Sequence, residues 1–280
     1  MRHNETREII FLNGKFIPAK EACLPVLTLG FLYGWGLFES MRAYDNKIVY
    51  FDEHLKRIGK SAKLMDIKCP YAPARLKGVI HEAVKISGFK DAYARLTLWK
   101  SENGADILVT VKKYRSYPSR KYKEGFHAFI SSFRQNNDSL FAQLKTTNYL
   151  ICRLAYGQAL KKGFDEALIL NHKGYIAEGS RSNLFFVKGK ELFTPSLKCG
   201  CLDGITRRVV FDLAKKYKIE AFEGNFTIQD LAGSNEAFLT NSLMGIMPLA
   251  SVEGRCIGRN TGRRQLSSLF MKQYASLFKK

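Results

Sequence analysis

The chain has 280 residues, of which 46% are hydrophobic, and its 45 Lys and Arg against 25 Asp and Glu give a formal net charge of +20. This length and composition indicate a globular protein with a large core and about two domains. No apolar run reaches the roughly 18–20 residues of a membrane span, and the N-terminus lacks the apolar core of a signal peptide. The sequence therefore predicts a cytoplasmic protein without a membrane segment.

The high positive charge attracts anions over long distances. Nucleic acid is the first candidate partner, but the sequence has no RNA-binding aromatic signature, zinc finger or clear helix-turn-helix. We therefore interpret the charge as a solubility feature or an attraction for small phosphorylated and carboxylated ligands, and nucleic acid is not the expected partner. The six cysteines lie in apolar segments and indicate reduced, mostly buried thiols. The KCGC stretch has no second Cys or His pair beside it, so no metal site is expected.

The first half of the chain alternates strand-like and helix-like segments. Residues 8–18, EIIFLNGKFIP, predict a hairpin, because Asn13-Gly14 is a strong turn dipeptide. Residues 52–65 predict a helix that is opened by Asp52 and has one apolar face. The other elements expected in this half are a strand at 47–51, a helix at 74–88 that ends at Gly88, and strands at 93–99 and 106–114.

A Pro- and Lys-rich stretch, RSYPSRKYKEG at 115–125, interrupts this pattern and is the expected linker. We therefore expect an N-terminal α+β domain over residues 1–117 and a C-terminal α/β domain over residues 118–280. The tail at 263–280 predicts a docked amphipathic helix rather than a membrane-surface helix. The other elements expected in the second domain are a strand at 126–134, a helix at 148–163, a meander of strands at 166–195 and a helix at 206–217.

One lysine differs from the many that lie in charged runs. Lys145, in LKTTNYL, has no other charge within three residues on either side. It precedes an expected helix that Thr147 or Asn148 could cap. The positive end of that helix and partial burial beside Leu144 and Leu150 would lower the pKa of Lys145. A neutral lysine amine is a nucleophile suited to covalent chemistry with a carbonyl, whereas the alternative is an ordinary surface lysine in a loop.

Two segments offer groups for a phosphate. Thr206 starts a helix, and the strand that reads FLTNS ends in Thr240, Asn241 and Ser242. Both places present hydroxyls and backbone amides, which suit a phosphate. Arg57, on the helix expected at 52–65, could add a fixed positive charge.

Glu178 ends the strand that reads YIAEG, where its carboxylate could pair with a protonated ring nitrogen. With Lys145 and the phosphate groups, it completes the parts that a pyridoxal phosphate site needs. The order and spacing of several motifs resemble the fold-type IV enzymes, the class IV aminotransferase family of branched-chain and D-amino-acid aminotransferases and 4-amino-4-deoxychorismate lyase. The resemblance runs from FLNGKFIP to about Gly254. Its motifs are FLYGWGLFESMRAY, DEHLKRIGKSA, LKTTNYL, GFDEALILNHKGYIAEGSRSNLFFV, LDGITRR and TNSLMGIMPL.

The resemblance implies a two-domain α+β fold, pyridoxal phosphate as cofactor, and a homodimer with its active site between the domains and near the partner subunit. It implies that Lys145 forms the internal aldimine and moves the substrate's α-proton, while Glu178 keeps the pyridine nitrogen protonated. For Tyr149 a core-facing helix residue is the open alternative. The residues implied at the cofactor are Arg57, Lys145, Tyr149, Glu178, Ser182, Asn183, Leu202, Ile205, Thr206, Asn241 and Ser242.

The substrate side departs from the family pattern. Where many relatives read YGDG, this chain has Tyr33-Gly34-Trp35-Gly36, and Tyr33 is a candidate substrate contact. Because the motif differs, the substrate specificity of the relatives does not carry over to this chain. Where relatives often have arginine after the RLTLW strand, this chain has Lys100. Lys100 could bind a substrate carboxylate or face water.

Two reactions fit the same lysine, glutamate and phosphate site. The FES motif places a hydroxyl at Ser40 that could guide a proton, and TNSLMGIMP resembles lyase sequences; both favour 4-amino-4-deoxychorismate lyase, which releases 4-aminobenzoate and pyruvate. Against this, KSENGAD replaces the Gly-rich stretch of some lyases. The alternative is a branched-chain or D-amino-acid aminotransferase that uses a 2-oxo acid acceptor. A non-catalytic basic binding protein is the third reading.

Overall fold

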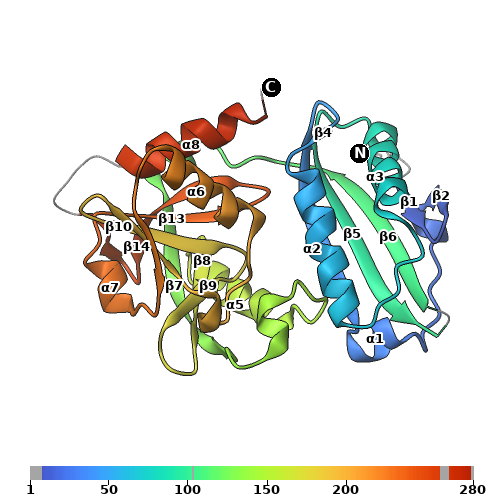
Figure 1. Cartoon of the computed structure of the whole chain (residues 1–280), viewed down its shortest axis with the longest axis horizontal. Helices are drawn as coiled ribbons and strands as arrows, with labels where there is room; N and C mark the ends of the chain where they lie inside the picture. Colours follow the sequence, from blue (N-terminus) through green and yellow to red (C-terminus); the bar gives the residue numbers. More distant parts are fainter. Residues whose placement is uncertain (1–7, 103, 259–264, 279–280) are drawn as a thin grey trace. The chain divides into compact units, whose positions relative to one another are not determined.

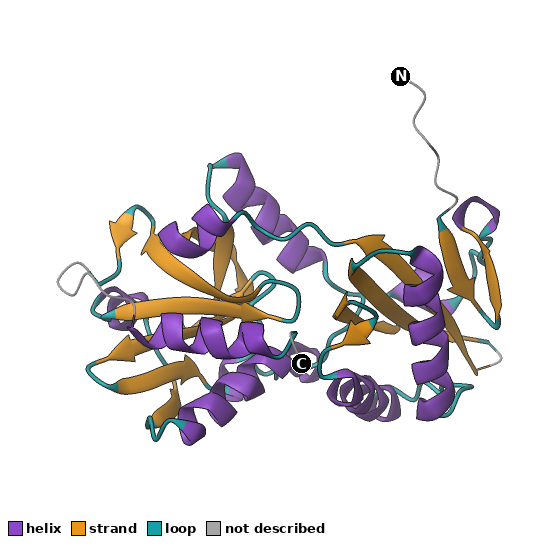
Figure 2. Cartoon of the chain, turned by 90° about the horizontal axis from the view of Figure 1, so that it is seen from above, coloured by secondary structure: helices purple, strands orange, loops and turns teal. Residues whose placement is uncertain are grey.

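The computed structural model describes residues 8–102, 104–258 and 265–278. The chain divides into two compact units, which Figure 1 shows in the colours of the sequence. The first unit comprises residues 1–115 together with 145–148, and the second comprises 116–144 and 149–280. Figure 2 shows that each unit is built from a sheet with helices packed against it. Lys145, expected in the second domain, belongs to the first unit, because Thr146 forms a β-bridge with Leu37.

The first unit contains a six-stranded antiparallel sheet in the order β2-β1-β6-β5-β3-β4. Helices α2 and α3 pack on it, and the short α1 contacts β5. The elements of this unit are β1 (Ile9–Leu12), β2 (Lys15–Pro18), a 3₁₀ turn (Ala19–Glu21), α1 (Leu29–Tyr33), β3 (Gly36–Tyr44), β4 (Lys47–Ile48), α2 (Phe51–Leu64), α3 (Pro73–Ser87), β5 (Asp91–Ser101) and β6 (Gly104–Lys113).

Most of the expected elements of the first unit are confirmed, and the differences have local causes. Asn13 and Gly14 adopt positive φ in the turn of the expected hairpin. Tyr50 has φ 54°, which ends the expected strand at β4 and makes Tyr50, rather than Asp52, the residue before α2. Helix α3 ends at Gly88, whose φ of 67° is the left-handed conformation that glycine adopts without steric cost.

The two faces of this sheet differ. Side chains alternate along a strand, so Leu37, Glu39 and Met41 of β3 share one face and are almost fully buried there. The opposite face carries half-exposed side chains, among them Ser40 and, from the paired strand β5, Arg95. The face toward the helices is therefore buried and apolar except for Glu39, whereas the opposite face carries more polar, partly exposed side chains.

The second unit contains a nine-stranded sheet in the order β12-β11-β10-β13-β14-β7-β8-β9, with β15 paired to β14. Helix α5 packs on β7 and β8, while α6 and α8 pack on β13 and on each other. The elements are α4 (Ser119–Glu124), β7 (Phe126–Gln135), a 3₁₀ turn (Leu140–Gln143), α5 (Leu150–Lys161), β8 (Glu166–Asn171), β9 (Ile176–Gly179), β10 (Asn183–Lys188), β11 (Glu191–Pro195), a 3₁₀ turn (Leu197–Cys199), α6 (Ile205–Lys216), β12 (Ala221–Gly224), α7 (Ile228–Ala232), β13 (Glu236–Asn241), β14 (Gly245–Val252), β15 (Arg255–Cys256) and α8 (Gln265–Ser276).

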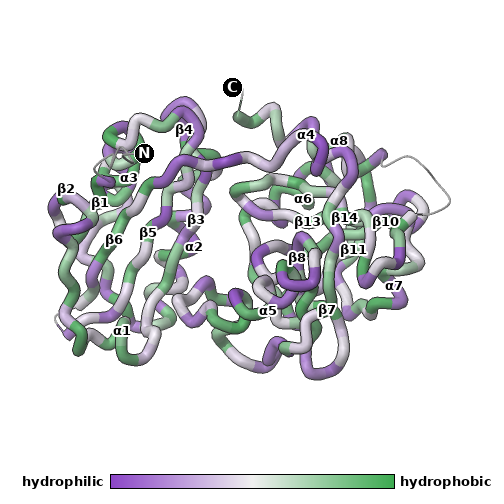
Figure 3. Tube along the Cα trace, turned by 180° about the vertical axis from the view of Figure 1, so that it is seen from behind, coloured by the Kyte–Doolittle hydropathy of each residue, from purple (hydrophilic) through white to green (hydrophobic). Residues whose placement is uncertain are grey.

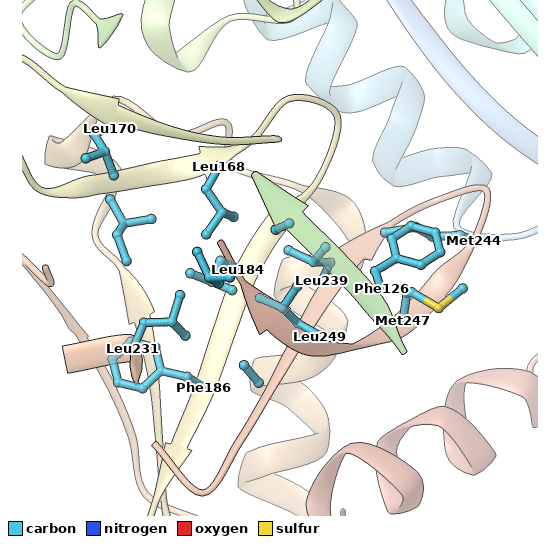
Figure 4. Close-up of a cluster of buried hydrophobic side chains, with 14 residues drawn as sticks. Phe126, Leu168, Leu170, Leu184, Phe186, Leu231, Leu239, Met244, Met247 and Leu249 are labelled. Atoms are coloured by element: carbon cyan, nitrogen blue, oxygen red, sulfur yellow. The ribbon is translucent and has the colours of Figure 1, made fainter. Parts of the chain in front are cut away.

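Apolar side chains from several strands fill the core of the second unit (Figure 4), with Phe126 and Phe186 fully buried. The expected linker contains the short helix α4, and Figure 3 shows the chain leading into it as hydrophilic. The expected terminal helix is confirmed as α8, which buries Phe270 and Tyr274; residues 263–264 and 279–280 of that prediction lie outside the described residues.

The cysteines are only partly as expected. All six are free thiols, and Cys199 and Cys201 are buried, but Cys23 and Cys256 are exposed because they lie outside the packed elements or on an edge strand. Among residues 8–102, 104–258 and 265–278 there is no group of three or more His, Cys, Asp or Glu side chains that could hold a metal ion. No helix in the described residues is long and apolar enough to cross a membrane.

Candidate active site

The backbone around Lys145 is fixed on strand β3. The N–H of Phe38 donates to the carbonyl of Lys145 at 2.9 Å, and the N–H of Thr147 donates to the carbonyl of Gly36 at 2.9 Å. Helix α5 begins only at Leu150, whose side chain is 68% exposed. Lys145 therefore lies on an extended segment paired with β3, and not directly before a helix as the sequence predicted. Lys145 and Leu144 are partly buried, as expected, whereas Leu150 is exposed.

Thr147 and Asn148 do not cap α5. Their side chains donate to the carbonyl oxygen of Gly34, at 2.8 Å from Thr147 Oγ1 and 3.0 Å from Asn148 Nδ2. Gly34 has φ 62°, and a Cβ atom there would lie 2.2 Å from Asn148 Oδ1. These hydrogen bonds from Thr147 and Asn148 to Gly34 join the segment after Lys145 to the end of α1.

The side chain of Lys145 lies over an aromatic ring on the polar face of the sheet. Its Nζ is 4.5 Å from the ring centroid of Phe38, and the Arg95 guanidinium carbon is 3.8 Å from the same centroid. Ser40 Oγ lies 3.3 Å from the hydroxyl of Tyr93 on the same face. The structure thus gathers an amine, a guanidinium, an aromatic ring and two hydroxyls.

Tyr93 and Arg95 are not among the site residues predicted from the sequence. The signal was the alternation in YARLTLW, where Tyr93, Arg95 and Thr97 occupy one side of a strand and apolar residues occupy the other. Arg95 Nε donates to Thr97 Oγ1 at 3.2 Å, and no ion pair with a carboxylate involves Arg95 among the described residues. A half-buried guanidinium in this setting can bind an anionic group of a ligand.

Arg57 lies in a buried charged cluster with two other side chains. Its Nε and Nη2 donate to the two oxygens of Glu39, both at 2.7 Å, and His54 Nδ1 lies 2.7 Å from Glu39 Oε2. Burial raises the pKa of the Glu39 carboxyl, but the charge and hydrogen bonds of Arg57 and His54 outweigh it and lower that pKa from 4.5 to about 2. Glu39 is therefore an ionised carboxylate at neutral and mildly acidic pH.

The two expected substrate contacts have different surroundings. Lys100 Nζ is bound by Asp66, 2.5 Å from Oδ2 and 2.6 Å from the carbonyl oxygen, and lies 5.3 Å from the ring centroid of Trp35. This hydrogen bond and the charge of Lys100 lower the pKa of Asp66. Tyr33 is the last residue of α1 and is 68% exposed.

In the second unit, Glu178, Asn183 and Leu202 form one hydrogen-bonded group. Glu178 Oε2 accepts from the N–H of Leu202 at 3.0 Å and from Asn183 Nδ2 at 3.4 Å, and Asn183 Nδ2 also donates to the carbonyl of Leu202 at 2.8 Å. A Cβ atom on Gly204 would lie 2.1 Å from Asn183 Oδ1. Strands β9 and β10 are thereby joined to the loop before α6.

Tyr149 and Ser182 support a buried turn. Tyr149 donates its hydroxyl to the carbonyl of Ser180 at 2.8 Å, and burial raises the pKa of Tyr149 well above its usual value. Ser182 Oγ donates to Glu166 Oε2 at 3.0 Å. Glu166 is fully buried, and this burial raises the pKa of its carboxyl. Both hydroxyls therefore hold the turn between Glu178 and Asn183 in place.

The start of α6 suits an anion. The residue before it, Gly204, provides no side-chain cap, and Ile205 and Thr206 are buried there. Thr240, opposite Asn183 in the β10–β13 pairing, has a buried hydroxyl that finds no hydrogen-bond partner among the described residues. A buried, uncapped helix N-terminus and an unpaired hydroxyl on a strand that α6 packs against fit a phosphate.

The segment after Thr240 is a turn that uses its own side chain. Asn241 Oδ1 accepts from the N–H groups of Leu243 and Met244 at 3.0 and 2.8 Å, and Asn241 Nδ2 donates to the carbonyl of Arg181 at 3.1 Å. The side chain of Asn241 therefore fixes the turn that presents the backbone of Ser242. Together with the Glu178 carboxylate, these groups suit the phosphate and the ring nitrogen of pyridoxal phosphate.

Comparison with known proteins identifies the family of the chain. Residues 36–252 match the family model of the class IV amino-transferases. A putative branched-chain-amino-acid aminotransferase of Methanocaldococcus jannaschii is 36% identical over an alignment of 258 positions that covers 89% of each chain. The aminodeoxychorismate lyase of Bacillus subtilis is 29% identical over an alignment of 283 positions that covers 96% of each chain.

Solved structures show the same likeness in three dimensions. The branched-chain aminotransferase of Thermoproteus uzoniensis with norvaline gives a TM-score of 0.89 at 29% identity, over 98% of this chain and 95% of that one. A second branched-chain amino acid aminotransferase, solved with pyridoxamine 5′-phosphate, gives 0.88 at 29% identity, over 97% and 95%. The chain belongs to the class IV aminotransferase family and has its α+β fold. It is a pyridoxal phosphate-dependent enzyme of fold type IV, as the sequence motifs implied.

Proposed function

We propose that the protein is an amino acid aminotransferase that acts on branched-chain substrates and passes the amino group to a 2-oxo acid. The branched-chain aminotransferases among its relatives support this reading, since one of them has the higher identity, 36% against 29% for the lyase. The sequence-based preference for the lyase rested on Ser40 and the TNSLMGIMP stretch. These two features involve only a few residues, whereas the two identities are taken over 89% of the chain or more.

The observation that carries the proposal is the placement of Lys145 and Arg95 on the ring of Phe38. Bound pyridoxal phosphate supplies a carbonyl that takes up amines and a ring that accepts electrons from the substrate's Cα–H bond. Lys145 supplies the amine that holds this group and moves the α-proton. Arg95 binds a carboxylate of the amino acid or oxo acid, and Ser40 and Tyr93 position hydroxyls beside it.

The remaining predicted residues bind and orient the cofactor. Glu178, held by the N–H of Leu202 and by Asn183, pairs with the protonated ring nitrogen. The proposed phosphate ligands are the start of α6 with Ile205 and Thr206, the hydroxyl of Thr240, the turn at Asn241 and Ser242, and the guanidinium of Arg57. Leu202 packs on the ring, whereas Tyr149 and Ser182 act through the turn that joins β9 to β10.

We also propose that the protein is a homodimer. The segment from Leu24 to Trp35 exposes several large apolar side chains in the single chain. Such an apolar patch is typical of a surface that another protein covers. A second copy of the chain is the occupant that the family resemblance implies. The exposed residues are Leu24, Val26, Leu27, Phe31, Leu32, Tyr33 and Trp35, each between 36% and 71% exposed.

The reaction is tested by incubating the cofactor-loaded protein with leucine, isoleucine, valine and a panel of D-amino acids, each with 2-oxoglutarate, and measuring glutamate. Turnover of the three branched-chain L-amino acids is the expected result. In a parallel reaction the protein is incubated with 4-amino-4-deoxychorismate and no oxo acid. The release of 4-aminobenzoate and of pyruvate is then measured. Catalytic release of both products without transamination overturns the aminotransferase proposal in favour of the lyase.

A further inference from the structure

Three polar side chains between β3 and α2, those of Glu39, His54 and Arg57, are more buried than an ordinary surface ion pair. Glu39 and His54 have side chains that are 1% exposed, and that of Arg57 is 9% exposed. Both carboxylate oxygens of Glu39 are used, one by Arg57 Nε and the other by Arg57 Nη2 and His54 Nδ1. The guanidinium therefore meets the carboxylate through two parallel hydrogen bonds.

Such a cluster is a poor way to stabilise a fold. Removing charges from water costs free energy that their attraction repays only with good geometry, and apolar side chains of similar size often stabilise as well or better. Its physical advantage is geometric, because two parallel hydrogen bonds fix the plane and the direction of a guanidinium. A fixed guanidinium binds an anion without first losing side-chain rotational freedom.

We propose that Glu39 and His54 are positioning residues that orient Arg57 toward the phosphate of the cofactor. This proposal rests on the proposed function, in which Arg57 binds that phosphate. Glu39 fixes Arg57 through the Nε and Nη2 edge, and His54 fixes Glu39 from the other side through Oε2. The side chains of Glu39 and His54 are 1% exposed, so we expect them to act on the phosphate only through Arg57.

The test compares two cofactor forms that differ only in the phosphate. Apoprotein is titrated with pyridoxal 5′-phosphate and with pyridoxal, and the ratio of the two dissociation constants is measured for the wild type, Glu39→Gln, Arg57→Ala and the double variant. We expect Glu39→Gln to weaken pyridoxal phosphate binding about tenfold, the size of one lost charge-assisted hydrogen bond, and to leave pyridoxal binding unchanged. In the Arg57→Ala background, Glu39→Gln should have no further effect on the ratio.

A matched control is available in the same sheet. Arg42 and Asp91 form another two-bonded pair, at 2.8 and 2.7 Å, and are not among the proposed phosphate ligands. Asp91→Asn should leave the ratio of dissociation constants unchanged even if it lowers the melting temperature. If Glu39→Gln does not fold by circular dichroism, His54→Asn takes its place with the same readout and a smaller loss in the same direction.

The outcomes distinguish the assignment of Arg57 to the phosphate from the positioning role of Glu39 and His54. If Arg57→Ala leaves the ratio unchanged, Arg57 does not bind the phosphate and the assignment in the proposed function is wrong. If Arg57→Ala lowers the preference for pyridoxal phosphate but Glu39→Gln and His54→Asn do not, the positioning role is overturned and the phosphate assignment stands. If Glu39→Gln weakens both cofactor forms equally, the cluster has only a structural role.

Discussion

Phe38 contacts both ends of Lys145: its N–H donates to the lysine carbonyl at 2.9 Å, and its ring lies 4.5 Å from the lysine Nζ. One residue of β3 thus contacts both the backbone and the side chain of the lysine that is proposed to hold the cofactor. The isolation of Lys145 in the sequence marked it as unusual, but its attachment to β3 depends on a pairing between segments about a hundred residues apart, which no local pattern shows.

We expect Lys145→Ala to lose the visible absorbance band of covalently attached cofactor when pyridoxal phosphate is added. The alanine side chain has no amine to react with the aldehyde, so any remaining binding should be non-covalent. Absorbance spectra over a pH series measure this directly. Lys77→Ala, which removes a lysine paired with Asp52 on the surface, is the control that should keep the band. An unchanged, pH-sensitive band in Lys145→Ala would show that another amine carries the cofactor.

The hydrogen bonds from Thr147 and Asn148 to the Gly34 carbonyl lead to a prediction about stability. Asn148→Ala removes one hydrogen bond to the Gly34 carbonyl and should lower the free energy of unfolding by about 1 kcal/mol. Gly34→Ala should cost more, because the new Cβ would lie 2.2 Å from Asn148 Oδ1 and the φ of 62° is unfavourable for alanine. Urea unfolding of both variants and of the double variant measures these costs.

The double variant distinguishes the steric conflict from the backbone strain. Asn148→Ala removes the atom that the new Cβ would meet, so the double variant should be more stable than the sum of the single effects predicts. Strict additivity of the two changes would contradict the close approach of Gly34 and Asn148.

Local patterns predicted the fold better than they predicted side-chain partners. The hairpin at Asn13-Gly14 and the end of α3 at Gly88 follow from backbone preferences that act within a few residues, and both are confirmed. The role of Thr147 was predicted wrongly, because a hydroxyl before a helix can cap it or donate to a distant carbonyl, and only the tertiary structure decides. Arg57 and Glu39 lie on different elements, and nothing in either segment alone shows that they pair.

The shifted pKa of Glu39 predicts how stability depends on pH. Because the folded pKa of about 2 lies below the value of 4.5, Glu39 contributes stability that is fully present above pH 4.5 and is lost as the pH falls through about 2. The shift corresponds to about 3 kcal/mol at most. Urea unfolding between pH 6 and 2.5 should show a smaller acid loss in Glu39→Gln than in the wild type. Parallel curves for the two proteins would rule out a carboxylate with a lowered pKa at this position.

The exposed apolar segment around α1 predicts the oligomeric state. Phe31 is 71% exposed in the chain, so Phe31→Glu should leave the fold intact while placing a charge in the proposed dimer interface. Sedimentation velocity should then show a dimer for the wild type and a monomer for the variant. Leu64→Glu, at a site that is 54% exposed on α2, is a control of similar chemistry that should remain dimeric. A wild-type monomer would contradict the homodimer proposal.

Arg95 allows the substrate side to be tested apart from the cofactor side. Its guanidinium lies over the ring of Phe38, and its Nε donates to Thr97 Oγ1. Among the described residues Arg95 forms no ion pair, so Arg95→Gln removes a charge without breaking one. The loss of a charge-assisted contact to a substrate carboxylate should raise KM for the amino acid or the oxo acid tenfold or more, by about 1.5–3 kcal/mol. The dissociation constant of pyridoxal phosphate should stay the same, because the role proposed for Arg95 is at the substrate and not at the cofactor. Arg95→Lys should recover part of the loss, since lysine keeps the charge but not the two-pronged geometry. A variant that loses cofactor affinity with an unchanged KM would instead place Arg95 at the cofactor, and the carboxylate of the substrate would need another partner.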